Sequence, residues 1–129
     1  MKKILLDTNA YTHLLAGDQD ILEVLGEADT VWMSIFVLAE LYVGFKGGSR
    51  ESANRSLLRD FLRRSTVRIL SATDDTAEIF ASLKHQLKTA GTPVPINDLW
   101  IASHAVECGA QVITYDAHFR SIPGLLLWR

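Results

Sequence analysis

Four acidic residues lie in mostly apolar sequence, where an ionised carboxylate without a partner would be costly to bury. They are Asp7, Glu40, Asp98 and Asp116. Carboxylates placed in this way often meet at one site, where a shared divalent cation removes their mutual repulsion. Mg²⁺ prefers oxygen ligands, and Mn²⁺ suits the same kind of site. Such an ion can activate water and stabilise charge on a phosphoryl group, so the pattern predicts metal-dependent hydrolysis of phosphodiesters.

Each of the four acids also has a structural explanation. Asp7 and Asp98 stand where a helix is expected to begin, and Asp is a favoured N-cap residue. Asp116 could be a turn residue before the next short helix. Glu40 is the hardest to explain structurally, because the apolar run around it offers no partner. Any one acid alone would more often be structural, but the four together favour a single site.

The elements expected around these acids alternate between strands and helices. Strands are expected at residues 3–6, 30–35, 67–70, 111–115 and 125–128, and helices at 10–16, 21–25, 36–45, 49–64, 74–90, 98–107 and 117–119. This alternation predicts one α/β domain over residues 1–129, with a central parallel sheet of about five strands flanked by helices. Ligands of such sheets bind beyond the carboxyl ends of the strands, where Asp7 and Asp116 are expected.

The expected helix ends follow from capping residues and glycines. Thr8 or Asn9 is expected to cap the first helix, and Ser49 the helix that runs to about residue 64. Asn97 or Asp98 is expected to begin the helix before the fourth strand. The long helix before it is expected to start with a cap at Thr73 or Asp74 and to stop at Gly91.

Composition sets limits on where the protein works. The chain has 129 residues, 48% of them hydrophobic, and a single cysteine, Cys108, which excludes a disulfide within the chain. The basic start at residues 1–3 is followed by only three apolar residues, too few for a signal peptide. No stretch approaches the ~18 apolar residues of a membrane span. A protein of the reducing cytoplasm, without a membrane, is therefore expected.

The charge is unevenly distributed along the chain. Residues 46–68 hold seven basic and two acidic residues, a local charge of +5 in a chain whose net charge is −2. Within this segment Arg55, Arg59 and Arg63 recur every four residues and should form one stripe on a helix. The stripe is interpreted either as a contact for RNA or a partner, or as an ordinary solvated helix face.

Several other features point away from competing chemistries. Gly47 and Gly48 are not followed by the lysine of a phosphate-binding loop, and the histidines lack zinc-ligand spacing. Asn9 stands where a dehalogenase-like phosphatase would need a second aspartate. A receiver domain would want an acidic pair after the first strand, which Thr8 and Asn9 do not supply. His118, two residues after Asp116, could contact substrate, but a position at the surface is expected instead.

Trp100 and His104 are four residues apart and should share one helix face. This face is interpreted as part of a dimer or partner surface, with core packing of Trp100 as the alternative.

At this point the sequence resembles a known family. The segments that carry the resemblance are residues 5–9, 34–44, 96–102, 112–119 and 122–125. Their order and spacing resemble those of PIN-domain ribonucleases and, among these, of the VapC toxins of bacterial toxin–antitoxin pairs. The resemblance runs from one end of the chain to the other. It implies an endoribonuclease that depends on Mg²⁺ or Mn²⁺ and uses the four acids as its catalytic residues.

The resemblance also implies roles and partners. Asp7 and Asp98 would bind the metal directly, and Glu40 and Asp116 through water or a second ion. The side chains of two further residues, Asn9 and Thr114, would orient the acids or water.

The partners implied are an RNA substrate, a second copy of the chain in a homodimer, and a VapB-like antitoxin that covers the acidic site. DNA would be reached only through the antitoxin. The alternative is a non-catalytic PIN-like module that acts as a regulatory binding protein with such a partner.

Overall fold

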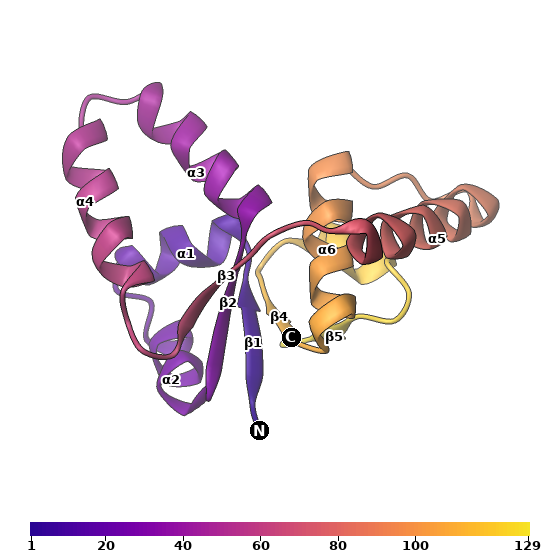
Figure 1. Ribbon diagram of the computed structural model, residues 1–129, viewed down its shortest axis with the longest axis horizontal. Helices are drawn as coiled ribbons and strands as arrows, with labels where there is room; N and C mark the ends of the chain where they lie inside the picture. The colour runs from indigo at the N-terminus through magenta and orange to yellow at the C-terminus, as the bar shows by residue number, and fades with distance from the viewer.

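A computed structural model describes residues 1–129 (Figure 1). Five strands form one sheet in the order β3-β2-β1-β4-β5, and every neighbouring pair is parallel. They are β1 (Lys3–Leu6), β2 (Thr30–Ser34), β3 (Val67–Leu70), β4 (Gln111–Ile113) and β5 (Leu126–Leu127). The predicted α/β class and the parallel sheet are thereby confirmed.

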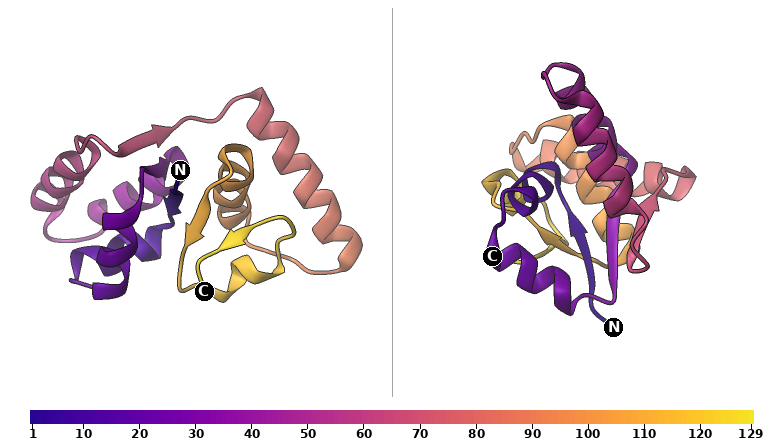
Figure 2. Two further views of the ribbon diagram at one scale, coloured as in Figure 1. Left: turned by 90° about the horizontal axis from the view of Figure 1, so that it is seen from below. Right: turned by 90° about the vertical axis from the view of Figure 1, so that its left-hand side faces the viewer.

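Helices cover both faces of the sheet. They are α1 (Thr8–Leu15), α2 (Gln19–Glu27), α3 (Ile35–Lys46), α4 (Glu51–Leu62), α5 (Asp74–Ala90), α6 (Ile96–Cys108) and the 3₁₀ helix η1 (Ala117–Ser121). Helices α1 to α4 lie on one side of the sheet and α5 and α6 on the other, as Figure 2 shows. None of these helices combines the length and the apolar character needed to cross a bilayer.

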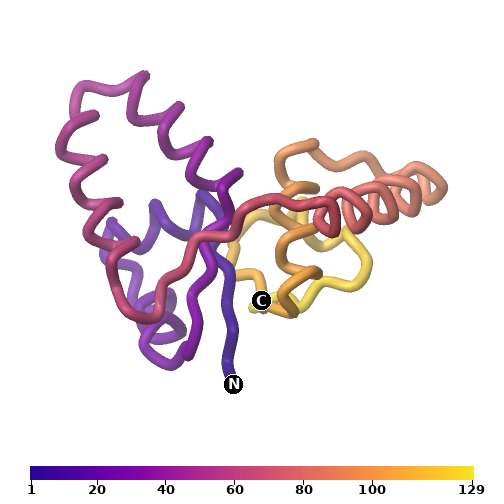
Figure 3. The backbone as a smooth tube through the Cα atoms, viewed as in Figure 1, coloured from indigo at the N-terminus to yellow at the C-terminus, as the bar shows by residue number.

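The reversal in strand order explains this division of the helices. The chain moves outward from β1 to β2 and β3, and then returns past β1 to form β4. Crossovers between parallel strands are right-handed, so the return path carries α5 and α6 over the opposite face. Figure 3 traces this path along the backbone. The switch point lies between β1 and β4, where a ligand is expected beyond the strand ends.

The two strands at the switch point form the centre of the core. Ile4, Leu5 and Leu6 of β1 and Val112 and Ile113 of β4 are fully buried. Their apolar runs do not alternate with polar residues because helices cover both faces of the sheet. These buried strands give the residues that follow them a rigid base.

The start of α1 differs from the expectation. Asp7, rather than Thr8 or Asn9, is the N-cap, because its Oδ1 accepts a hydrogen bond of 2.7 Å from the backbone N–H of Ala10. Thr8 and Asn9 therefore lie in the first turn of α1. The side chain of Thr8 is free to point toward other elements as a result.

Two further predicted caps are wrong. Helix α6 begins after Pro95, whose extended backbone and missing N–H suit a helix start, so Asn97 and Asp98 lie inside the first turn. Helix α4 has Arg50 rather than Ser49 at its N-cap position and has no side-chain cap. For α5 the prediction is confirmed. It begins after Thr73 and ends at Gly91, whose φ of 70° is easy only for glycine.

Strand β4 is shorter than predicted. Thr114 and Tyr115 leave the sheet because the Thr114 hydroxyl bonds to Asp7 and accepts a 2.9 Å hydrogen bond from the backbone N–H of Asp116. These bonds to a side chain replace the strand ladder and form a turn. The turn aims Asp116 toward the end of β1. Strand β5 is likewise limited to two residues.

His104 is not on the surface, and that part of the prediction is wrong. Its side chain is fully buried, and its Nδ1 lies 2.7 Å from the Ser34 hydroxyl at the start of α3. Trp100 is half-buried and stacks on Phe80 and Phe36, with ring centroids 3.8 and 5.1 Å away. These contacts join α6 to α3 and α5, so they hold the helices that carry Asp98 and Glu40 in fixed relation.

Candidate active site

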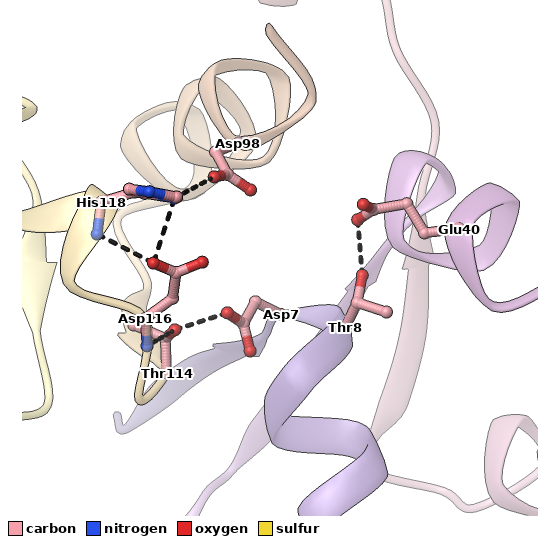
Figure 4. A network of polar contacts seen from close by, with 7 residues as sticks. All are labelled: Asp7, Thr8, Glu40, Asp98, Thr114, Asp116 and His118. Carbon is pink, nitrogen blue, oxygen red and sulfur yellow. Dashed lines mark hydrogen bonds and ion pairs between the residues drawn. The ribbon is translucent and has the colours of Figure 1, made fainter. Parts of the chain in front are cut away.

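All four predicted acids line one cavity of about 320 Å³ beyond the carboxyl ends of β1 and β4. Its lining residues are Asp7, Thr8, Asn9, Thr12, Glu40, Asp98, Ile101 and Asp116. Figure 4 shows the acids approaching from three directions, which are the β1–α1 junction, α3, and the paired α6 and η1. No lysine or arginine lines the cavity to balance the acids.

Asp7 is the most buried of the four. Only 4% of the residue is exposed. The Thr114 hydroxyl donates to its Oδ2, and the backbone N–H of Ala10 to its Oδ1. Burial raises the pKa of Asp7 to about 6, and the charges of Asp116 and Asp98 act in the same direction, against the lowering effect of the two hydrogen bonds. The cost of burying the ionised carboxylate is therefore not fully offset by its hydrogen bonds, and a bound cation would offset it.

Asp98 and Asp116 face each other across His118. The Nδ1 of His118 lies 3.3 Å from Asp98 Oδ2 and 3.2 Å from Asp116 Oδ1. The backbone N–H of His118 also donates to Asp116 Oδ1, at 2.9 Å. Burial raises the pKa of Asp98, and the neighbouring charge of Asp116 adds to the effect. The three side chains offer donor atoms that lie within 4.8 Å of one another, and Asp7 and Glu40 line the cavity outside this group.

Glu40 reaches the cavity from α3, opposite Asp98 (Figure 4). Its Oε1 accepts a 2.6 Å hydrogen bond from the Thr8 hydroxyl. Thr8 can make this bond because Asp7 takes over the capping of α1. Thr8 thus orients Glu40, a role that sequence reasoning missed although Thr8 directly follows Asp7.

The remaining predicted site residues lie at different places. Asn9 is exposed and lines the cavity, whereas Thr114 is buried, does not line the cavity and contacts Asp7 through its hydroxyl. His118 was expected at the surface, and its side chain is indeed 58% exposed, yet its ring touches two of the acids. Its position two residues after Asp116 already suggested a contact at the site, although with substrate rather than with the acids.

The arginine stripe on α4 does not remain whole. Arg55 forms a 3.0 Å ion pair with Glu51, and its guanidinium lies 4.6 Å from the centre of the Tyr42 ring. Arg59 and Arg63 are exposed. Of the three arginines, Arg59 on α4 and Arg63 directly after it are the two that remain available for a contact with RNA.

The chemistry of the cavity fits a hard divalent cation. Its polar lining consists of carboxylates, hydroxyls and one amide, all of which offer oxygen ligands. Two of its acids have raised pKa values because they are buried beside like charges, and a bound cation would reverse that effect. The residues present are therefore those that would hold Mg²⁺ or Mn²⁺.

The parallel sheet and the acid-lined cavity at its switch point indicate the class of protein. Similarity to known proteins identifies that class. Residues 4–125 match the PIN domain family, and the chain belongs to that family. It is 32% identical over 128 residues to Ribonuclease VapC2 of Rickettsia felis, a match that covers 95% of this chain and 94% of the relative. It is 33% identical over 122 residues to Ribonuclease VapC5 of Mycobacterium tuberculosis, covering 92% and 87%. Within the family, the chain thus groups with proteins named VapC.

Solved structures agree with this assignment. The DNA-bound VapBC of Salmonella typhimurium matches with a TM-score of 0.87 at 27% identity, covering 98% of this chain and 97% of that one. VapBC2 of Rickettsia felis, bound to a DNA fragment from its promoter, matches with a TM-score of 0.84 at 30% identity, covering 97% and 96%. Both neighbours are complexes of a toxin with its antitoxin, and the resemblance read from the sequence is confirmed.

Proposed function

We propose that this protein is an endoribonuclease dependent on Mg²⁺ or Mn²⁺, and the toxin of a VapBC-type toxin–antitoxin pair. The observation that carries the proposal is the cavity at the β1–β4 switch point, lined by four carboxylates and no cationic side chain. Phosphodiester hydrolysis suits this site because it requires no nucleophile from the protein. The relatives named ribonucleases support the choice of RNA as substrate.

Each side chain of the site has a defined task in this proposal. Asp7, Asp98, Asp116 and Glu40 hold the ion or ions. A divalent cation bound there supplies activation of water and stabilisation of negative charge on the phosphate. The hydroxyls of Thr114 and Thr8 orient Asp7 and Glu40, so the carboxylates are positioned before substrate arrives. Asn9 offers an amide at the rim of the cavity.

Cleavage of RNA by the purified chain tests the proposal. Total cellular RNA is incubated with the protein and Mg²⁺ or Mn²⁺, and in parallel with an excess of chelator. We expect discrete fragments with metal and intact RNA with chelator. Intact RNA in every condition, from protein that is folded and free of antitoxin, would favour the alternative of a non-catalytic binding module.

An exposed apolar groove supports the proposal of an antitoxin partner. The groove has a volume of about 330 Å³, lies among α1, α2 and α4, and is lined by Leu14, Leu15, Leu22, Leu57, Asp60, Phe61 and Arg64. Three of its leucines are between 41% and 49% exposed, which is unfavourable unless a partner covers them. We propose that an apolar segment of the antitoxin does so, and that DNA is reached only through this antitoxin. The homodimer stays a prediction, which sedimentation of the purified chain measures.

Charge reversal of Arg59 and Arg63 to glutamate tests the proposed RNA contact of α4. If these exposed guanidinium groups contact phosphates, the double variant should bind RNA at least about tenfold more weakly at low salt, and its affinity should depend less steeply on salt. Filter binding across a salt series measures both. Reversal of Lys84 and Lys88 to glutamate is the matched control, because both are exposed on α5, four residues apart, and lie outside the acidic cavity. Binding and salt dependence equal to those of the wild type would leave the stripe a solvated helix face.

A further inference from the structure

His118 has a position that the ribonuclease proposal alone does not explain. A single ring nitrogen, Nδ1, faces Asp98 Oδ2 at 3.3 Å and Asp116 Oδ1 at 3.2 Å. An N–H shared between two acceptors bonds weakly to each, and hydrogen bonds between charged groups are normally about 2.7–2.9 Å long. The ring is also 58% exposed, where an ion pair contributes little stability. The placement is thus a poor hydrogen bond to either carboxylate.

The same distances fit neighbouring ligands of one metal ion. In octahedral coordination with ligands at about 2.1 Å, adjacent ligand atoms lie about 3.0 Å apart. Nδ1 stands close to that separation from an oxygen of each acid, and the three donor atoms form a group within 4.8 Å. Figure 4 shows the ring turned toward both carboxylates.

Local structure holds the ring in this place. The backbone N–H of His118 donates to Asp116 Oδ1 at 2.9 Å, and the backbone N–H of Asp116 donates to Thr114 Oγ1 at 2.9 Å. The next residue, Phe119, is 1% exposed and anchors η1 in the core. The backbone that carries His118 is therefore fixed by the turn that also aims Asp116.

We propose that His118 is a nitrogen ligand of the ion held between Asp98 and Asp116, and that it makes the site prefer a transition-metal ion such as Mn²⁺ over Mg²⁺. Mg²⁺ prefers oxygen ligands, whereas transition metals accept imidazole nitrogen. This inference rests on the proposed metal-dependent function and adds one ligand that the four acids do not supply. His118 sets the choice of metal, and the carboxylates provide the charge.

Electron spin echo spectroscopy of Mn²⁺ bound to the full chain tests the inference directly. Nitrogen-14 of a coordinated imidazole modulates the Mn²⁺ echo, so the wild type should show this modulation and His118→Gln should lack it. His85→Gln is the matched control, because His85 is exposed on α5 and does not belong to the group of possible metal ligands. In equilibrium titrations His118→Gln should bind Mn²⁺ at least about tenfold more weakly, with a smaller change for Mg²⁺.

The outcomes separate this inference from the function on which it rests. Bound Mn²⁺ without nitrogen modulation in the wild type would overturn the role of His118 and leave the carboxylate site intact. Wild-type protein that binds no Mn²⁺ would overturn both. Circular dichroism of His118→Gln checks that it folds, and His118→Ala gives a second variant. Equal Mn²⁺ affinity in wild type and both variants would also contradict the proposal.

Discussion

Replacing Asp98 with asparagine is expected to lower metal-dependent RNA cleavage by about 10³-fold or more, because several kcal/mol of transition-state stabilisation depend on the bound ion. The asparagine would keep the shape of the side chain and remove its charge. The fold should survive, since the N-cap position of α6 belongs to Pro95 and Asp98 has no capping role. Removing one of several like charges also relieves repulsion with Asp116.

The measurement compares cleavage rates and thermal unfolding of the wild type, Asp98→Asn and a control. Asp75→Asn suits as control because Asp75 is an exposed acid in the first turn of α5 and does not line the cavity. If the protein is a toxin, its expression should arrest bacterial growth, and Asp98→Asn should relieve the arrest. Cleavage that persists unchanged in Asp98→Asn would mean that the cavity is not the active site.

The sequence was sufficient to predict the sheet and the convergence of the acids. Continuous apolar runs such as residues 4–6 are typical of strands buried on both faces, and the chain alternates such runs with helical segments. Once the strands are parallel, their carboxyl ends share one edge. Asp7 and Asp116 then lie on the same edge of the sheet, and the pairing of β1 with β4, which the structure shows, brings them together.

Details that depend on competition between hydrogen bonds could not be predicted. Thr8 and Asp7 are both good N-caps, and the choice of Asp7 follows from the position of Ala10 N–H relative to the end of β1. Thr114 has strong strand propensity, but its hydroxyl finds partners in Asp7 and in the backbone of Asp116. Periodicity carries no information about either choice.

The two histidines were misjudged for a related reason. His104 satisfies its Nδ1 by a bond to Ser34, which lies 70 residues away in the sequence. A histidine that finds such a partner can be buried in the core, and one without it stays outside. His118 is exposed, as expected, but a turn brings it against Asp98. In both cases the deciding neighbour belongs to a distant element.

The second large effect is expected on the free energy of unfolding, which a substitution at Asp7 should increase. Asp7→Asn should stabilise the metal-free protein at pH 7 by about 1–3 kcal/mol while removing activity. Burial raises the pKa of Asp7 to about 6, compared with about 3.9 in an unfolded chain. Keeping this carboxylate ionised in the fold therefore costs about 3 kcal/mol at pH 7. Asparagine removes that cost, less whatever its amide loses in hydrogen bonding near Thr114.

The sign of the pH dependence follows from the raised pKa. Between pH 4 and 6 the folded protein binds the Asp7 proton and the unfolded chain releases it, so stability falls as pH rises. The contribution of the protonated group is fully present below about pH 4 and is lost as pH rises through about 6. The advantage of Asp7→Asn over the wild type should thus be largest above pH 7 and shrink toward pH 4. Asp98, whose pKa is also raised, titrates in both proteins and largely cancels in the difference.

Thermal unfolding of chelator-treated wild type and Asp7→Asn at pH 7.5 and pH 5 measures this difference. At pH 7.5 the variant should melt several degrees higher, since about 1 kcal/mol shifts the midpoint by roughly 3–5 °C in a domain of this size. Mn²⁺ should raise the midpoint of the wild type more than that of the variant, because only the wild type keeps the full set of carboxylates. A variant that is less stable at both pH values would contradict the prediction, because the hydrogen bonds of Asp7 would then outweigh the cost of burying its charge. A variant that melts higher than the wild type at pH 7.5 would show that the fold tolerates a costly buried charge at the end of β1. This is expected if that charge is kept for binding a cation.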